Sequence, residues 1–98
     1  MHIVVARLKV KPEYFKEFME RLEKHVSASR NEGRCMKFNV NAAVDDQMEL
    51  LYYEEYPSAE AFDQHIGSPR VSKHLSETAS MIDGEVWFKR WNSIDDNW

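Results

Sequence analysis

The order in which strand-like and helix-like patterns follow one another limits this chain to few folds. Residues 2–10 are mostly apolar or β-branched, which indicates a strand. Residues 12–29 carry apolar side chains at three- and four-residue spacing, which indicates an amphipathic helix. Residues 36–44 alternate between apolar and polar side chains, and the tyrosine-rich segment 48–56 follows after a polar turn. The first half therefore predicts a strand, a helix and a β-hairpin.

The second half of the chain predicts an interrupted helical region and one more strand. Ser58 is suited to cap a short helix that ends at Gly67. The Ser68-Pro69 step is suited to begin the next helix, which we expect to end at Gly84. Residues 85–91 are rich in aromatic side chains and form the last predicted strand.

The resulting order, β-α-β-β-α-β, is that of the ferredoxin-like α+β fold. In this fold a four-stranded antiparallel sheet is covered by helices on one face. A chain of 98 residues has room for a single domain. We therefore predict one domain over residues 1–98, with an acidic C-terminal tail at residues 92–98.

The first and last strands, residues 2–10 and 85–91, are apolar on both faces, although the helices can cover only one face of the sheet. The other face needs a cover, and a second copy of the same sheet is the simplest one. We therefore predict a homodimer in which two sheets face each other as a dimeric α/β barrel. A monomer whose open sheet face is half polar is the alternative.

Composition and charge exclude several classes of protein. Thirteen Lys and Arg residues against 17 Asp and Glu residues give a net charge of −4, which argues against nucleic acid as the main ligand. No apolar stretch approaches the ~18 residues of a membrane span, and the N-terminus is too polar for a signal peptide. Cys35 is the single cysteine, as expected in a reducing compartment. We expect a cytoplasmic protein that binds neither nucleic acid nor membranes.

The sequence carries no motif for a metal or a nucleotide cofactor. Its four histidines and one cysteine show neither HExxH nor CxxC spacing. The three glycines are too far apart for a GxGxxG motif or a phosphate-binding loop. We therefore expect no cofactor and no metal.

The end of the segment 48–56 holds the candidate catalytic carboxylate. Glu54 and Glu55 are adjacent in a strand, so one of them must point towards the face that the helices cover. A carboxylate there needs a partner, and His65, at the edge of the next apolar stripe, is the candidate. A Glu54–His65 pair lining a cavity could move protons near neutral pH. The alternative is an ion pair that only fixes the helix to the sheet.

The other histidines give weaker indications. His74 lies beside the stripe of the last helix and is a candidate for substrate binding, with a structural or surface histidine as the alternative. His25 lies similarly on the first helix, where a structural role is favoured. His2 is expected to have no role, because it lies at the terminus.

Aromatic side chains make up 12% of the chain, and most of them are expected to be core. A cavity lined by aromatic side chains and a few polar groups would hold a small planar or carbonyl-bearing substrate. Phe18 and Phe38 are candidates for such a wall. Asn39 follows Phe38 and is a polar candidate, with a solvent-facing strand residue as the alternative.

The segment from the middle strand to the last helix resembles the antibiotic biosynthesis monooxygenase (ABM) domain family. That family has a Tyr-Glu-x-Trp/Tyr strand end, a short helix, then a histidine and a Ser/Thr-Pro step. The matching residues here are Leu51 to Tyr56, Ser58 to Phe62, His65, and Ser68-Pro69. The resemblance implies a ferredoxin-like fold, a dimer, and a pocket between sheet and helices. It also implies that Glu54 and His65 are the pocket Glu and His, and that Tyr56 is the pocket aromatic.

One position departs from the family pattern. Many members of the family carry a second histidine directly after the Pro, whereas this chain has Arg70. Arg70 could instead bind an anionic substrate group or an enolate. His74 lies one helical turn further on.

The resemblance implies that the protein is an enzyme with a small-molecule substrate. The favoured activity is a cofactor-independent monooxygenase that acts on a small quinol, phenol or carbonyl compound through a substrate anion. His65, oriented by Glu54, would be the general base, and Arg70 or Asn39 would steady the oxyanion. One alternative is an isomerase that processes phosphorylated autoinducer-2, a dione. A non-catalytic binding or stress-response module is the other.

Overall fold

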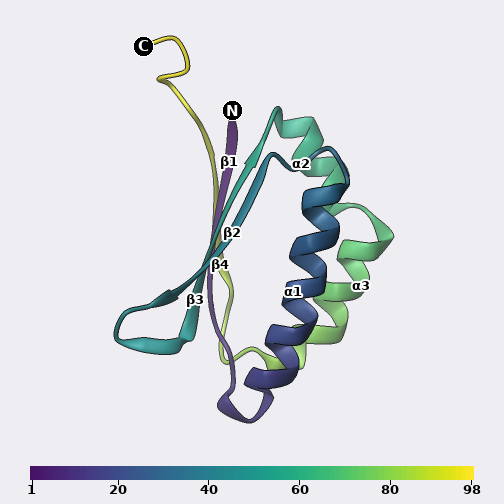
Figure 1. Cartoon of the computed structure of the whole chain (residues 1–98), viewed down its shortest axis with the longest axis vertical. Coiled ribbons are helices and arrows are strands. Elements are labelled where there is room, and N and C mark those ends of the chain that lie inside the picture. The colour runs from purple at the N-terminus through teal and green to yellow at the C-terminus, as the bar shows by residue number, and fades with distance from the viewer.

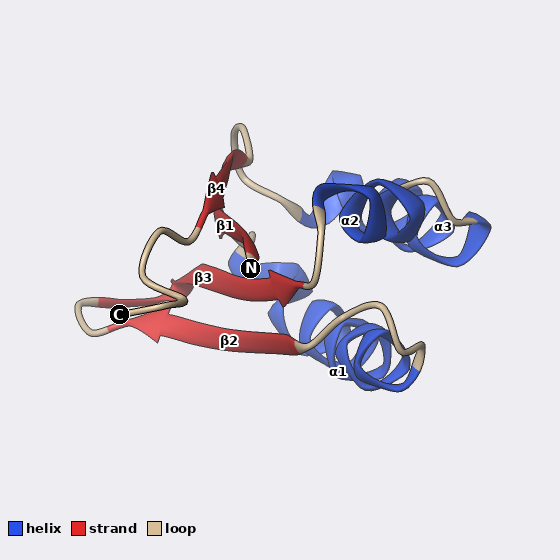
Figure 2. Cartoon of the chain, turned by 90° about the horizontal axis from the view of Figure 1, so that it is seen from above, coloured by secondary structure: helices blue, strands red, loops and turns tan.

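The protein consists of one four-stranded antiparallel sheet with three helices on one of its faces (Figures 1 and 2). The computed structural model describes residues 1–98. The strand order in the sheet is β2-β3-β1-β4, so the α+β ferredoxin-like prediction is confirmed. The elements are β1 (His2–Lys9), α1 (Phe15–Asn31), β2 (Lys37–Ala43), β3 (Asp46–Tyr56), α2 (Ala59–Ile66), α3 (Pro69–Thr78) and β4 (Trp87–Asn92), with short 3-10 turns at Pro12–Tyr14 and Ala79–Met81.

Both predicted serine caps are present. The Ser58 hydroxyl accepts a hydrogen bond from the amide of Ala61 at 3.1 Å, and the Ser68 hydroxyl accepts one from Val71 at 3.3 Å. These bonds satisfy amide donors that the first turn of a helix leaves free. They divide the region into α2, which carries His65, and α3.

The last helix is shorter than the sequence predicted. α3 ends at Thr78 rather than near Gly84, because the chain after the 3-10 turn joins the sheet. Ile82 forms an isolated bridge with Val10, and the amide of Asp83 donates to the carbonyl of Lys9 at 2.7 Å. The apolar Ile82 thus belongs to the sheet edge instead of extending the helical stripe.

Strand register decides which side chains face the helices. Val4 of β1 lies between Glu54 of β3 and Arg90 of β4, and Glu54 lies opposite Phe38 of β2. Val4, Phe38 and Glu54 point to the face that the helices cover. The side chains on this face form the core, together with the inner face of α1 and residues of α2. The most buried members are Val4, Val10, Phe18, Leu22, Phe38, Leu50 and Tyr56.

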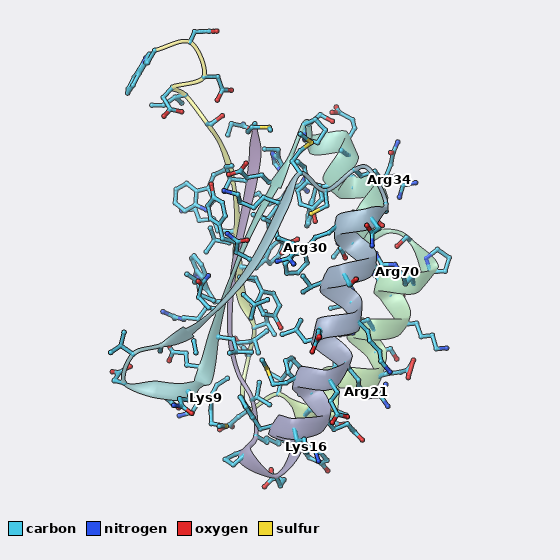
Figure 3. The ribbon with its side chains drawn as sticks, viewed as in Figure 1. Lys9, Lys16, Arg21, Arg30, Arg34 and Arg70 are labelled. Carbon is cyan, nitrogen blue, oxygen red and sulfur yellow. The ribbon has the colours of Figure 1, made fainter.

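Arginine also ties the helix layer to the sheet. Arg30, near the end of α1, reaches the carbonyl oxygen of Phe38, with Nη2 at 2.6 Å and Nε at 3.1 Å (Figure 3). This contact holds α1 against the edge strand β2, beside the cavity described below.

The opposite face of the sheet has no cover within the chain. As the alternation predicts, Trp87 and Trp91 lie on this face, where they are 44% and 46% exposed. Arg7 lies 5.7 Å from the Trp87 ring and Lys89 lies 4.5 Å from the Trp91 ring, both in cation–π geometry. That a second copy covers this face stays a prediction.

The C-terminal tail extends beyond the sheet on the side of the N-terminus (Figure 1). The N-terminal amino group holds its first part by donating to Ser93 Oγ at 2.8 Å and to Asp96 Oδ2 at 2.9 Å. Ile94 and Trp98 remain 81% and 93% exposed. None of the helices has the length and apolar character that a membrane span requires.

Candidate functional site

A cavity of about 340 Å³ lies between the sheet and the helices. Its wall is mostly apolar, with one phenylalanine from each of four elements: Phe18 of α1, Phe38 of β2, Phe62 of α2 and Phe88 of β4. The polar side chains in the wall are His25, Tyr52, Glu54, His65, His74 and Thr78. Apolar walls with a few convergent polar groups are typical of small-molecule sites.

Glu54 lies on the sheet side of the cavity. It is 6% exposed, and its Oε1 accepts a hydrogen bond from the Tyr56 hydroxyl at 2.6 Å. Its Oε2 has no hydrogen-bond partner in the protein. Burial raises the pKa of Glu54 to about 7, against the opposing effect of the Tyr56 hydrogen bond. Near neutral pH this carboxyl group can therefore either give or take a proton.

His65 lies on the helix side of the cavity and is 2% exposed. Its Nδ1 lies 2.5 Å from Oε1 of Glu32, the residue that caps the C-terminus of α1. The other oxygen, Oε2, accepts from Arg70 at 3.0 Å. Burial alone would raise the pKa of Glu32, but the hydrogen bonds from His65 and Arg70 hold it below its usual value.

An ionised Glu32 defines the tautomer of His65. A carboxylate can only accept, so Nδ1 carries the proton and donates it, and the lone pair of the neutral ring is on Nε2. Nε2 makes no hydrogen bond within the protein. This nitrogen is therefore available to a ligand in the cavity.

The predicted Glu54–His65 pair is wrong in one respect. Glu32, not Glu54, is the carboxylate that binds His65, and Glu54 is bound by Tyr56 instead. Glu32 is 33 positions before His65, in a segment that the sequence marked only as the end of a helix. Packing of α1 against α2 and α3 brings the two together, and no local pattern shows this packing. Both Glu54 and His65 do face the same cavity.

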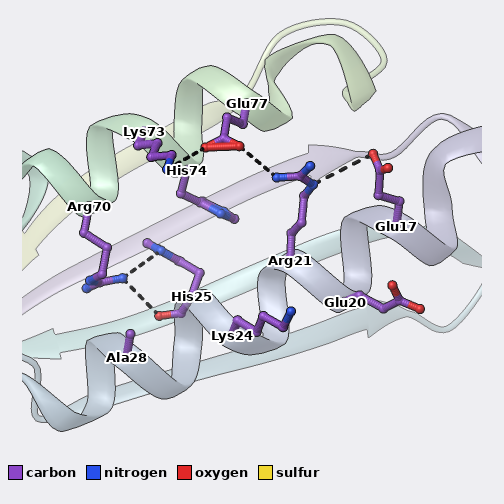
Figure 4. Close-up of a pocket in the computed structure, with 10 residues that line it drawn as sticks. All are labelled: Glu17, Glu20, Arg21, Lys24, His25, Ala28, Arg70, Lys73, His74 and Glu77. Atoms are coloured by element: carbon purple, nitrogen blue, oxygen red, sulfur yellow. Dashed lines mark hydrogen bonds and ion pairs between the residues drawn. The ribbon is translucent and has the colours of Figure 1, made fainter.

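Arg70 lies outside the cavity. From the first turn of α3 it donates to His25 Nδ1 at 3.1 Å, to Ser29 Oγ at 3.2 Å and to Glu32. It faces a separate polar cleft of about 620 Å³ between α1 and α3 (Figure 4). Its guanidinium group is occupied by these contacts, so the predicted role in steadying a substrate oxyanion has no geometric support.

His25 and His74 separate the polar cleft from the cavity, because both line each of them. Their rings stack with centroids 4.0 Å apart and planes within 5°. Burial, with His74 and Arg70 adding to it, lowers the pKa of His25 to about 3. Burial and then Arg70 also lower the pKa of His74. The pair is neutral at physiological pH and forms a wall of the cavity.

The remaining candidates are placed as follows. Asn39 is exposed on the open face of the sheet, since alternation in β2 sends it away from Phe38. Tyr56 is fully buried and does not line the cavity; it contacts Glu54 rather than a ligand. His2, expected to have no role, is buried and accepts a hydrogen bond from Arg90 Nε at 2.9 Å.

No group of three or more side chains that could hold a metal ion is found in the chain. The cavity wall contains no lysine or arginine. Its polar groups are thus suited to accept and donate protons rather than to bind a phosphorylated cofactor.

The chain matches the family model described as antibiotic biosynthesis monooxygenase over residues 1–76. It is similar to the structure of a conserved protein from Methanosarcina mazei Go1, at 25% identity and a TM-score of 0.89, with 95% of this chain and 92% of that chain covered. A structure called antibiotic biosynthesis monooxygenase is 18% identical, with a TM-score of 0.89 and 96% and 99% of the two chains covered.

A protein from Mycobacterium tuberculosis is 23% identical, with a TM-score of 0.88 and 99% and 98% of the two chains covered. No curated protein matches the sequence. The family match covers most of the chain, and the fold agrees over nearly all of it. The chain therefore belongs to the antibiotic biosynthesis monooxygenase family.

Proposed function

We propose that the protein is a cofactor-independent monooxygenase that removes a proton from a small quinol or phenol bound in the cavity. The observation that carries the proposal is His65, whose Nδ1 donates to Glu32 while its Nε2 has no partner and the ring lines the cavity. A neutral imidazole held in this tautomer is suited to general-base catalysis.

In the first step, Nε2 of His65 takes the proton of a substrate hydroxyl or of an activated C–H group. The ring becomes an imidazolium ion that donates from Nδ1 to ionised Glu32, and this charge pair stabilises it. The substrate is left as an anion in an apolar cavity. Glu32 does not touch the substrate and acts as a positioning residue.

The substrate anion then supplies electrons to molecular oxygen, the co-substrate. One oxygen atom enters the organic product and the other leaves as water, with two protons and two electrons from the substrate. The reaction therefore balances without a further reductant. The departing oxygen takes up two protons to become water. Glu54, with a pKa of about 7 and its Oε2 free, supplies one and recovers one from the substrate, and the imidazolium ion of His65 gives up the other, which restores the neutral base.

Oxygen consumption tests the proposal. The protein is dialysed against EDTA and offered a panel of quinols and phenols in an oxygen electrode. We expect oxygen uptake without added flavin or metal, with a hydroxyquinone formed from a quinol or a quinone formed from a phenol. His65→Ala should lower kcat/KM by ~10²–10⁴-fold, the usual contribution of a general base. Full activity of His65→Ala, or its unfolding in circular dichroism together with full activity of His65→Asn, contradicts the role.

Two other activities predict different outcomes. An isomerase would convert a dione without oxygen uptake, using His65 and Glu54 as its two proton-transfer groups. The wall lacks any cation that could bind a phosphate group, which disfavours a phosphorylated dione. A binding module would retain the ligand unchanged. Product analysis after incubation separates the three activities.

We also propose that the active form is a homodimer. The open sheet face supports it, since Leu51, Trp87 and Trp91 on this face are each at least 40% exposed. The cavity lies on the other side of the sheet, so the proposed dimer leaves it accessible.

A further inference from the structure

The cavity has an apolar mouth on the side of β4. Four of its wall residues are also exposed to solvent: Ile66 of α2 (41%), Leu75 of α3 (49%), Val86 before β4 (46%) and Phe88 of β4 (55%). We call these four residues the mouth. Exposed large apolar side chains that continue a cavity wall mark a route for an apolar ligand.

Two connections define the ends of the mouth. At one end Arg90 of β4 contacts α2, with its Nη2 at 2.9 Å from Asp63 Oδ1 and 3.3 Å from the carbonyl oxygen of Ala59. At the other end Ile82 bridges to Val10. No hydrogen bond or ion pair joins β4 to α3 between these two connections. This is where the protein leaves the cavity open.

The polar groups of the cavity are suited to an uncharged head. His25 and His74 are neutral, and burial keeps a large fraction of Glu54 protonated near neutral pH. No lysine or arginine lines the wall, so an anionic group would be buried without a partner. A volume of about 340 Å³ is at the small end for ligand sites, which leaves room for a ring system but not for a long substituent.

We propose that the substrate is an uncharged quinol or phenol with an apolar chain that leaves the cavity through the mouth. The inference rests on the proposed function, because it assumes that the ring lies at His65 and Glu54. The apolar chain of the substrate then contacts Leu75 and Phe88, and binding of the substrate removes their exposed surface from water. The mouth is continuous with the cavity wall, which favours this occupant over a protein partner.

Three probes with one ring test the proposal by calorimetry. They are 2-methyl-1,4-naphthoquinone, the same ring with a decyl chain at position 3, and the same ring with an oligoethylene glycol chain of equal length. These are oxidised compounds and are not turned over. We expect the decyl compound to bind at least ~10-fold more tightly than the ring alone, from burial of methylene groups. The glycol compound should bind no more tightly than the ring alone.

A matched pair of variants locates the effect. The double substitution Leu75→Ser and Phe88→Ser should abolish the advantage of the decyl compound, so that within this variant the decyl compound and the ring alone bind with about equal affinity. Because both residues also line the cavity, the readout is this ratio of affinities and not the affinity for the ring itself. Val44→Ser, in the hairpin far from the mouth and fully exposed, should retain the advantage. If the double variant does not fold by circular dichroism, Ile66→Ser replaces it, with a partial loss expected.

Two results would overturn the proposal: equal affinity for the first two probes, or an advantage that persists in a folded mouth variant. A mouth variant that changes the mass in light scattering would also overturn it, by showing that the mouth joins two copies. Failure of the proposed function would give a different result, because oxygen uptake would then be absent with every quinol. The ratio of the affinities for the decyl compound and the ring alone would still test the role of the mouth.

Discussion

Replacement of Glu32 by glutamine tests the central contact of the site. Gln has nearly the same shape but no charge. In the structure Oε1 of Glu32 accepts from His65 at 2.5 Å and Oε2 accepts from Arg70 at 3.0 Å. The amide of Gln has one oxygen and one NH2 group, so it can accept from only one of these two donors.

The size of the effect follows from the charged hydrogen bond that the substitution removes. A hydrogen bond to a charged group contributes ~1.5–3 kcal/mol, and each ~1.4 kcal/mol corresponds to a tenfold change in rate. The bond to His65 strengthens when the ring becomes an imidazolium ion, so the loss falls mainly on the transition state. We expect Glu32→Gln to lower kcat/KM by ~10–100-fold, with the loss in kcat rather than in KM.

The assay is oxygen uptake with one quinol between pH 5 and 9. Glu32→Asp, which keeps the charge, should recover part of the activity. Glu23→Gln, an exposed substitution on the same helix, is the control and should behave as wild type. Unchanged kcat in a folded Glu32→Gln, or a loss that falls on KM alone, would refute the reasoning.

Two further predictions concern stability and assembly. Because the pKa of Glu54 is raised from 4.5 to about 7, the folded state keeps a proton that the unfolded state releases above pH ~4.5. The free energy of unfolding should therefore fall by ~3 kcal/mol as the pH rises from 4.5 through 7, and then level off. Glu54→Gln should remove this dependence of the free energy of unfolding on pH, measured by chemical denaturation at pH 5 and pH 8. An equally large difference between the two pH values in the variant would assign the effect to another group. Trp91→Glu should convert the proposed dimer to a monomer of 11.6 kDa in light scattering, whereas a wild type that already has this mass would contradict the dimer.

The sequence predicted the fold because each element has its own local signal. Alternation in β2 and the serine caps at Ser58 and Ser68 act over a few residues, and the structure contains all of them. The end of α3 was wrong because Ile82 fits a helical stripe and a sheet bridge equally well. The choice depends on Val10, which is far from Ile82 in the sequence.

The site could be predicted only in part, for the same reason. Alternation in β3 correctly sends Glu54 to the covered face, and the helical stripe correctly brings His65 to the cavity. The partner of His65 depends on how the end of α1 packs against α2, which no pattern in either segment specifies. The sequence alone could have excluded Asn39 from the cavity. Phe38 points to the covered face of the sheet, so its neighbour Asn39 must point to the open face.

Arg70 shows how this chain differs from the family pattern that its sequence resembles. A second histidine at that position would offer another group that exchanges protons, whereas a guanidinium group stays charged at every physiological pH. Arg70 instead holds Glu32 ionised and joins the start of α3 to α1 through Ser29. In the proposed mechanism, proton transfer is then carried out by His65 and Glu54, which lie on opposite walls of the cavity. If His65 is the base that we propose, Arg70 supports it through Glu32 instead of providing a second base.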